Sequence, residues 1–238
     1  DTTVVHLSRS LPVSQKGELG RGLKGADVRF SVNGEAVSLA WTDDSIPGVP
    51  AQSYYAVKTY EDGDKVNITA AAEGMKAVSS ATVVPSRFPL TSINFVLKGG
   101  EPNQLQFWIH FTDNAQTKDY YALKVERKRQ FWNDSKYSVE NSSLTLNLDD
   151  EPLLNTSLGL DDILMIENEF YRNLYYWDDT KIQGKSYKVR LNTNYEADYE
   201  DDFITPDGVE HIKCQVKYRI SLYSLSEEFY RYLKSLND

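Results

Sequence analysis

The stretch Asp27–Trp41, "DVRFSVNGEAVSLAW", carries the clearest folding signal in the chain. Two runs in which apolar and polar residues alternate flank Asn33-Gly34, a dipeptide that favours a two-residue type I′ turn. We therefore predict a β-hairpin. Pairing outward from its turn places apolar residues opposite one another on one face: Phe30 with Val37, and Val28 with Leu39.

Short alternating runs continue after this hairpin. They are separated by turn residues and cover residues 53–60, 65–72 and 76–84. Several short strands divided by turns are typical of an immunoglobulin-like β-sandwich. Pro85 and Pro89 then interrupt strand pairing within five residues. We therefore expect a first domain at residues 1–86 and a second domain at residues 87–238.

Alternation also predicts a second antiparallel β domain after this boundary. Its clearest runs are "LQFWIHF" at 105–111, "DYYALKVERK" at 119–128 and "HIKCQVKYRISLYS" at 211–224. Residues 149–179 fit neither the helical nor the strand period, and their structure stays open. The apolar faces of the three runs consist of Leu105, Phe107, Ile109 and Phe111, then Tyr121, Leu123 and Val125, then Ile212, Cys214, Val216, Tyr218, Ile220 and Leu222.

The segment "YSLSEEFYRYLKSL", residues 223–236, predicts a helix at the end of the chain. Ser224 followed by Glu227 matches a capping box. An apolar stripe follows at helical spacing: Leu225, Phe229, Tyr232 and Leu236. A helix this short is marginal alone, and its polar side carries both signs of charge, so we expect the stripe to dock on the second domain rather than on a membrane. The predicted fold class is therefore all-β: an immunoglobulin-like β-sandwich followed by a second antiparallel β domain with a C-terminal helix.

The composition excludes several kinds of site and partner. The formal net charge is −9, so we expect no nucleic-acid partner, because phosphate binding needs a positive surface. Cys214 is the only cysteine, which rules out an intrachain disulfide or a cysteine zinc cluster. We expect its thiol to be buried and inert.

No catalytic signature stands out. The three histidines, His6, His110 and His211, lie far apart in the sequence, and no zinc-protease, nucleophile-elbow, P-loop or dinucleotide-binding motif is present. We therefore expect a protein that is not an enzyme, with no catalytic residues and no cofactor.

Two short stretches place aromatic side chains beside carboxylates, a combination that can stack on a sugar and hydrogen-bond to it. They are "FWND" at 131–134 and "YYWDD" at 175–179. In a chain with 16 tyrosines such a mixture also arises without a binding role. The candidate ligand-binding residues are Trp132, Asp134, Tyr175, Tyr176, Trp177 and Asp178.

The acidic stretch "EADYEDD", residues 196–202, contains carboxylates of the kind that bind calcium. Its spacing matches no EF-hand loop, so a solvated acidic loop is the favoured interpretation. Cross-strand pairing with acidic residues explains the basic face of 211–224, including Lys213. The weaker hypothesis of a metal site rests on Asp198, Glu200, Asp201 and Asp202.

The order of several segments resembles the DUF4249 family of Bacteroidota lipoproteins. These segments begin with "VHLSRSLP" and "GADVRFSVNGE" and continue with "FWIHFTDNAQTKDYYALKV", which contains an aspartate seven residues before a Tyr-Tyr pair. "YYWDDTKIQGKSYKVRL" and "ISLYSLSEEFYRYLKSL" complete the series. The resemblance extends over nearly the whole chain.

This resemblance implies an outer-membrane lipoprotein made with a signal peptide. Its membrane contact would be an N-terminal lipid anchor that is not present in this chain. Members are often encoded beside a TonB-dependent outer-membrane receptor, which makes such a receptor the expected partner. The resemblance implies no reaction and no functional residues. Our leading hypothesis is a non-enzymatic accessory or binding module, and the alternative is a glycan-acting hydrolase or a carbohydrate-binding protein.

Overall fold

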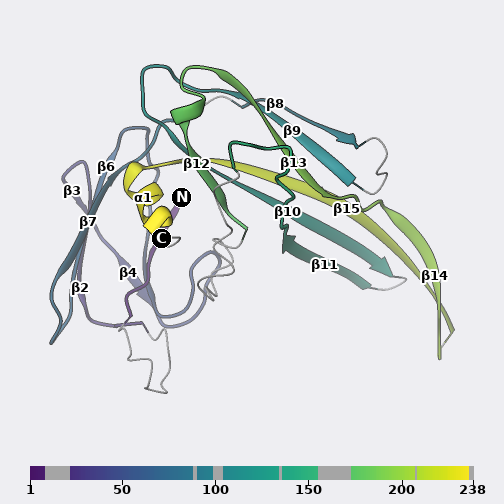
Figure 1. The fold of residues 1–238 in the computed structure, drawn as a ribbon. Helices are drawn as coiled ribbons and strands as arrows, with labels where there is room; N and C mark the ends of the chain where they lie inside the picture. The colour runs from purple at the N-terminus through teal and green to yellow at the C-terminus, as the bar shows by residue number, and fades with distance from the viewer. Residues whose placement is uncertain are drawn as a thin grey trace, which may run out of the picture. The chain divides into compact units, whose positions relative to one another are not determined.

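The part of the protein that the structure describes folds mostly into antiparallel β-sheets, with one short α-helix near the C-terminus (Figure 1). This confirms the predicted all-β, sandwich-like fold class. The chain divides into two compact units, Asp1–Ser86 and Arg87–Asp238. No helix in the described part is long and apolar enough to cross a membrane. The computed structural model describes residues 1–8, 22–87, 90–98, 104–133, 136–154, 173–206 and 208–235.

The described residues of unit 1 form two antiparallel sheets. The first has the order β1-β5-β4, and the second has the order β3-β2-β6-β7. The strands are β1 (Thr2–Val5), β2 (Asp27–Val32), β3 (Glu35–Val37), β4 (Ala40–Thr42), β5 (Ser53–Val57), β6 (Lys65–Ala71) and β7 (Val78–Val83).

The predicted hairpin is present in unit 1. Asn33 and Gly34 both have positive φ, 53° and 84°, as a type I′ turn requires. Phe30 pairs with Val37, as predicted, and Phe30 is buried. The outer pair predicted for this hairpin, Val28 with Leu39, is not formed in the ladder, because β3 ends at Val37 and the chain enters β4 of the other sheet at Ala40.

In unit 2, too, the described strands form two sheets. One has the order β13-β9-β8, and the other has the order β11-β10-β15-β14, with β12 paired to β10 as well. The elements are β8 (Leu90–Leu97), β9 (Gln104–Thr112), β10 (Tyr120–Asn133), β11 (Lys136–Ser143), β12 (Tyr175–Asp178), the 3-10 helix η2 (Asp179–Lys181), β13 (Ser186–Asn194), β14 (Tyr199–Thr205), β15 (Gly208–Leu225) and the helix α1 (Glu227–Ser235).

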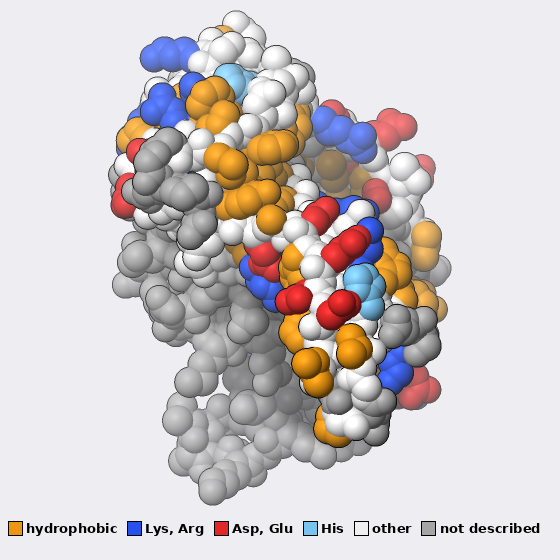
Figure 2. All heavy atoms as spheres, turned by 90° about the vertical axis from the view of Figure 1, so that its right-hand side faces the viewer, with side chains coloured by type: hydrophobic (Ala, Val, Ile, Leu, Met, Phe, Trp, Pro, Cys, Tyr) orange, Lys and Arg blue, Asp and Glu red, His pale blue; other side chains and the backbone are white. Residues whose placement is uncertain are grey.

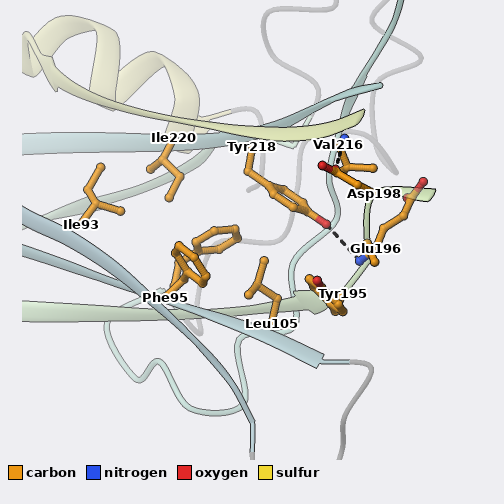
Figure 3. Close-up of a pocket in the computed structure, with 11 residues that line it drawn as sticks. Ile93, Phe95, Leu105, Tyr195, Glu196, Asp198, Val216, Tyr218 and Ile220 are labelled. Carbon is orange, nitrogen blue, oxygen red and sulfur yellow. Dashed lines mark hydrogen bonds between the residues drawn. The ribbon is translucent and has the colours of Figure 1, made fainter. Parts of the chain in front are cut away.

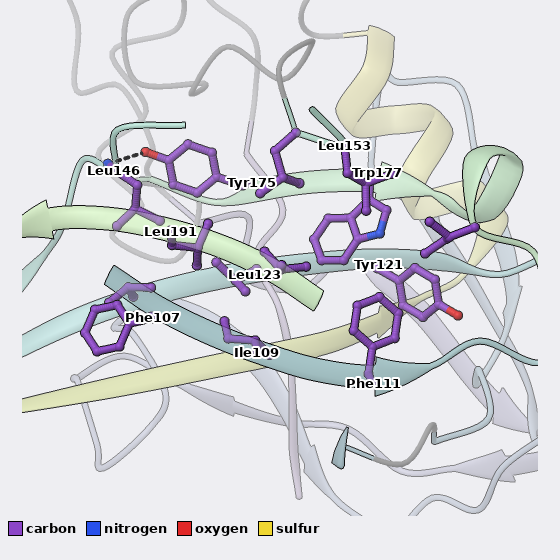
Figure 4. Close-up of a cluster of buried hydrophobic side chains, with 14 of the residues drawn as sticks. Phe107, Ile109, Phe111, Tyr121, Leu123, Leu146, Leu153, Tyr175, Trp177 and Leu191 are labelled. Carbon is purple, nitrogen blue, oxygen red and sulfur yellow. Dashed lines mark hydrogen bonds between the residues drawn. The ribbon is translucent and has the colours of Figure 1, made fainter. Parts of the chain in front are cut away.

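The core of unit 2 lies between the inner faces of these two sheets (Figure 4). The predicted apolar faces of β9 and of the first half of β10 are all buried in it. Strands β12 and β13 add Tyr175, Trp177, Val189 and Leu191. The hydroxyl of Tyr175 accepts a hydrogen bond from the amide of Leu146, at 2.8 Å, so this buried phenol is satisfied.

Helix α1 covers part of the outer face of the larger sheet. It packs against β10 where that strand is also paired with β12 and β15. Leu233 of α1 and Leu225, the last residue of β15, are buried together with Ala122 of β10 and Tyr176 of β12. The predicted docking of the helix on its own domain is therefore observed.

Two details of the helix prediction are wrong. Strand β15 continues through Ser224 to Leu225, and the cap is Ser226, whose hydroxyl accepts a hydrogen bond from the amide of Phe229 at 3.3 Å. The buried face of the helix is centred on Leu233, with Phe229 and Tyr230 partly buried beside it. Tyr232 is 50% exposed, whereas Leu233 is fully buried. The last residue of the predicted stripe, Leu236, lies outside the described residues.

Replacing Leu233 by alanine should lower the free energy of unfolding by about 3 kcal/mol, because the change leaves a cavity between the helix and the sheet. Tyr232→Ala on the exposed side is the matched control and should cost much less. Urea denaturation of both variants measures the difference. Equal losses would contradict the observed orientation of the helix.

The single thiol should react slowly in the folded protein. Cys214 is fully buried, opposite Phe131 of β10 and Tyr199 of β14. Burial raises the pKa of the Cys214 thiol, which reduces the thiolate fraction that reacts. We expect a colourimetric thiol reagent to label Cys214 only as urea opens the sheet, and stoichiometric labelling within seconds in native buffer would be inconsistent with this burial.

Candidate functional site

A pocket of about 620 Å³ opens between the two sheets of unit 2 (Figure 3). We call it the intersheet pocket. Val216, Tyr218 and Ile220 project into it from β15, while strands β8 and β9 form the opposite wall. The segment between β13 and β14 forms its rim. Its lining residues are Ile93, Phe95, Leu105, Phe107, Tyr195, Glu196, Ala197, Asp198, Val216, Tyr218 and Ile220.

Strand β8 extends the apolar surface beside this pocket. It is an edge strand of its sheet and pairs only with β9 among the described residues. Phe95 is 69% exposed, and three further large apolar side chains of β8 are exposed as well: Leu90, Ile93 and Leu97. Figure 2 shows hydrophobic side chains gathered in a patch on this side of the molecule, next to a band of acidic side chains. Contiguous exposed apolar surface of this kind is typical of interaction sites.

The rim of the intersheet pocket is held by a partly buried cluster of charged side chains. Both oxygens of Glu196 accept hydrogen bonds from two arginines of β10. Arg127 donates one at 2.6 Å, and Arg129 donates two, at 2.6 and 2.9 Å. The hydrogen bonds from Arg129 and the positive charges of both guanidinium groups hold the pKa of Glu196 below its usual value. Glu196 is therefore a poor proton donor near neutral pH.

Further hydrogen bonds fix the backbone of the same rim. The amide of Glu196 donates to the hydroxyl of Tyr218 at 3.3 Å, and the carboxylate of Asp198 accepts from the amide of Val216 at 2.8 Å. Figure 3 shows both contacts at one end of the pocket. The rim is thus pinned to β15, and the rest of the pocket surface is mainly apolar and aromatic. Such a site is suited to binding an apolar group.

A second, shallower hollow of about 570 Å³ lies elsewhere in unit 2. We call it the outer hollow. It contains an aromatic pair, Trp132 and Tyr137, whose ring centroids are 5.4 Å apart, and an ion pair between Lys213 and Glu200. Its lining residues are Trp132, Asn133, Lys136, Tyr137, Glu200, His211 and Lys213.

The structure separates the six sugar-binding candidates. Trp132 lies in the outer hollow, whereas Tyr175, Tyr176 and Trp177 are buried side chains of β12 and offer no ring to a ligand. Burial in the two clusters on either side of β12 corrects that part of the prediction. Asp178 caps the 3-10 helix η2 through the amide of Thr180. The remaining candidate, Asp134, lies outside the described residues.

The four calcium candidates do not converge on one point. Three lie in strand β14 rather than in a loop, which corrects the predicted acidic loop. Because side chains alternate along a strand, Glu200 and Asp202 face Lys213 and His211 across the ladder, while Asp201 points to the other side. Asp198 binds the Val216 amide instead. The predicted cross-strand pairing of Lys213 with an acidic residue is confirmed.

A carboxylate cluster that the sequence did not reveal lies near the start of β10. Oxygens of Asp113, Asp119 and Asp179 come within 4.8 Å of one another. Asp113 accepts hydrogen bonds from the hydroxyl of Tyr121 and from the amide of Gly184, the latter at 2.6 Å. Asp113 is the aspartate that precedes the Tyr-Tyr pair by seven residues, and Tyr121 is the second tyrosine of that pair, so this spacing has a structural role.

Protein donors also occupy the other two carboxylates of this cluster. Asp179 is fully buried and accepts from the ammonium of Lys118 and from the amide of Asp119. Asp119 accepts from Thr117 at 2.7 Å, and burial with the neighbouring negative charges raises its pKa. The arrangement ties the loop before β10 to η2, and Lys118 supplies a positive charge beside the fully buried Asp179.

The Glu196 cluster predicts a pH-dependent contribution to stability. The pKa of Glu196 is lower in the folded state than in the unfolded state. The Glu196 carboxylate therefore stabilises the fold above its unfolded pKa of about 4.3, and this stabilisation is lost as the pH falls through the folded pKa. Glu196→Gln should cost about 2 kcal/mol of unfolding free energy at pH 7, and the difference should shrink below pH ~4. Urea denaturation across pH 3–7 measures it.

Glu140→Gln is the matched control for that experiment. Glu140 also contacts Arg129, at 3.5 Å, but its side chain is 62% exposed, so its removal should change little. If the loss of unfolding free energy in Glu196→Gln stayed constant from pH 7 to pH 3, it would not come from the charge of the carboxylate.

Comparison with known proteins identifies one family. The model of the family described as "Domain of unknown function (DUF4249)" matches residues 1–238, the whole chain. No curated protein matches the sequence. The chain described above, with its two-sheet unit, intersheet pocket and outer hollow, therefore belongs to the DUF4249 family.

Proposed function

We propose that this protein is a non-catalytic accessory protein of the cell envelope that binds a TonB-dependent outer-membrane receptor. It would be attached to the outer membrane by a lipid anchor outside this chain, as a Bacteroidota lipoprotein. The resemblance of the sequence supports the location and the choice of partner. The exposed apolar strand β8 beside the intersheet pocket supports a binding role, and this surface is the observation that carries the proposal.

The expected occupant of this surface is an extended segment of the receptor. An edge strand presents unpaired backbone groups, to which an incoming strand adds by main-chain hydrogen bonds. Side chains of that segment would then reach the intersheet pocket, whose walls are apolar and whose charged rim residues Glu196 and Asp198 already have partners. Apolar side chains of the receptor segment would provide the affinity, and pairing with β8 would fix the orientation of that segment.

The same contacts favour binding over chemistry at the pocket. Hydrolysis of a glycosidic bond needs a carboxylic acid that keeps its proton near neutral pH. Two arginines keep Glu196 ionised instead, and Asp198 is committed to the backbone of β15. The acidic residues that line the pocket, Glu196 and Asp198, therefore have structural roles that hold its rim in place.

A glycan-acting hydrolase or a carbohydrate-binding protein is the second candidate. The observation in favour of a hydrolase is Asp119, a carboxyl group with a raised pKa beside Asp113 and Asp179. Glycosidases use a carboxylic acid with a raised pKa as their proton donor. However, Asp113 and Asp179 are both buried and hydrogen-bonded to the protein, so the accessory role has the stronger support.

Affinity purification of the full-length lipoprotein from native outer membranes tests the proposal. After mild cross-linking, the genetically linked receptor should be recovered above unrelated porins. Phe95→Asp should reduce that recovery at least tenfold, which corresponds to about 1.4 kcal/mol, because it puts a charge into the apolar contact. The melting temperature should change little, since Phe95 is 69% exposed.

Val57→Asp provides the matched control, because Val57 is an apolar strand residue of unit 1 with 75% exposure. This variant should recover the receptor as the wild type does. Recovery that is unaffected by Phe95→Asp would exclude β8 as the contact. Absence of any receptor together with turnover of a glycan would favour the hydrolase.

A further inference from the structure

We infer that the outer hollow is a binding platform for a neutral saccharide. This inference rests on the carbohydrate-binding alternative named above, for which it assigns a site and a ligand class, and it uses residues outside the proposed receptor contact. The outer hollow and the intersheet pocket lie on opposite faces of β15, because Lys213 and His211 alternate with Val216 and Tyr218 along that strand. A ligand on one face therefore leaves the other face free.

Four of the lining residues form one straight row across the sheet. Tyr137 of β11 pairs with Trp132 of β10, Trp132 pairs with Lys213 of β15, and Lys213 pairs with Glu200 of β14. Directly opposed residues in neighbouring strands project to the same side. Strands lie about 4.8 Å apart, so the row is about 14 Å long. This length suits a short oligosaccharide lying across the strands.

The first half of the row is aromatic and accessible. Trp132 is 36% exposed and Tyr137 is 54% exposed, with 47° between their ring planes. The side-chain amide of Gln130 donates to the Tyr137 hydroxyl at 2.6 Å and restrains that ring. The C–H faces of a pyranose ring pack on such exposed aromatic faces, while its hydroxyls remain free for polar contacts. The pair therefore offers a stacking surface.

The second half of the row offers hydrogen-bond donors and acceptors. Lys213 and Glu200 form an ion pair in which both side chains are about half exposed. In the next row His211 contacts Asp202 at 2.7 Å. Together these groups present both the donors and the acceptors that sugar hydroxyls require. They already hold one another in place, so little side-chain freedom is lost on binding.

The charge of this surface favours a neutral ligand. Lys136 and Lys213 are balanced by Glu200 and Asp202, so the described lining of the outer hollow carries no positive excess that would select a phosphate or a polyuronate. Helix α1 does not cover this end of the sheet: it packs at Ala122, and Trp132 lies about 33 Å further along β10. An uncovered aromatic row with balanced polar neighbours fits a neutral saccharide best.

Binding of three hexasaccharides tests the inference. Cellohexaose, chitohexaose and maltohexaose are titrated into the folded chain by calorimetry, and at least one should bind with a Kd of about 1 mM or tighter. Trp132→Ala should weaken that binding at least tenfold, whereas Trp132→Phe, which keeps a ring, should retain most of it. Tyr232→Ala removes an exposed aromatic residue of α1 and should have no effect.

A melting curve for each variant confirms that it is folded, and Tyr137→Ala replaces Trp132→Ala if the latter is not. Binding of none of the three sugars to the wild type would overturn the inference, as would equal binding by the wild type and the folded platform variant. Unchanged receptor recovery with Trp132→Ala would show that the saccharide platform is separate from the receptor contact. Cleavage of a bound sugar would assign the hollow to a hydrolase and also overturn the inference.

Discussion

Strand β10 has to bury both of its faces, and most of unit 2 can be understood from that requirement. An antiparallel sheet usually leaves one face to solvent. In the first half of this 14-residue strand, however, Tyr121 and Leu123 face the core between the sheets, while Ala122 faces the opposite side and is also fully buried. Helix α1 provides the cover for that second side. The short helix is thus required by the strand that it covers.

The same strand also connects the two candidate sites. Beyond the core, its inward residues become Arg127 and Arg129, which hold the rim of the intersheet pocket through Glu196. Its outward residues end at Trp132, in the outer hollow. One strand therefore supplies structural support on one face and an accessible aromatic ring on the other. Because both sites depend on the sheet itself, their side chains sit on a rigid frame rather than on loops.

Much of the fold could be predicted from the alternation of apolar and polar residues, because the strands involved have one face exposed to solvent. The faces of β9 and β15 follow the period of two, and Asn33-Gly34 marks its turn by the positive φ that these residues tolerate. Alternation fails where both faces are covered. Tyr175, Tyr176 and Trp177 are consecutive and all buried, which made a core strand resemble a surface aromatic cluster. The opposite error occurred in β14, where an edge strand rich in acidic residues resembled a loop.

The candidate sites were harder to predict, because they depend on long-range pairing. The aromatic half of the outer hollow is indicated locally in the sequence by Trp132. Its polar half forms only when strand pairing places Lys213 next to Trp132 and Glu200 next to Lys213. The carboxylate cluster likewise joins Asp113 to Asp179, and no short motif indicates that contact. The helix start was missed by two residues because both Ser224 and Ser226 can cap, and only the length of β15 decides between them.

The pairing of β10 with β15 has a consequence for how the chain folds. Tyr120 pairs with Leu225, about a hundred residues later, and non-local contacts of this kind make folding slow. In unit 1, by contrast, β2 and β3 can pair as soon as the turn between them is made. During synthesis the first unit can therefore assemble early, whereas β10 must wait with an apolar face and an open edge until β15 arrives. Unit 2 is the part of this chain with the greatest need for a chaperone during that interval.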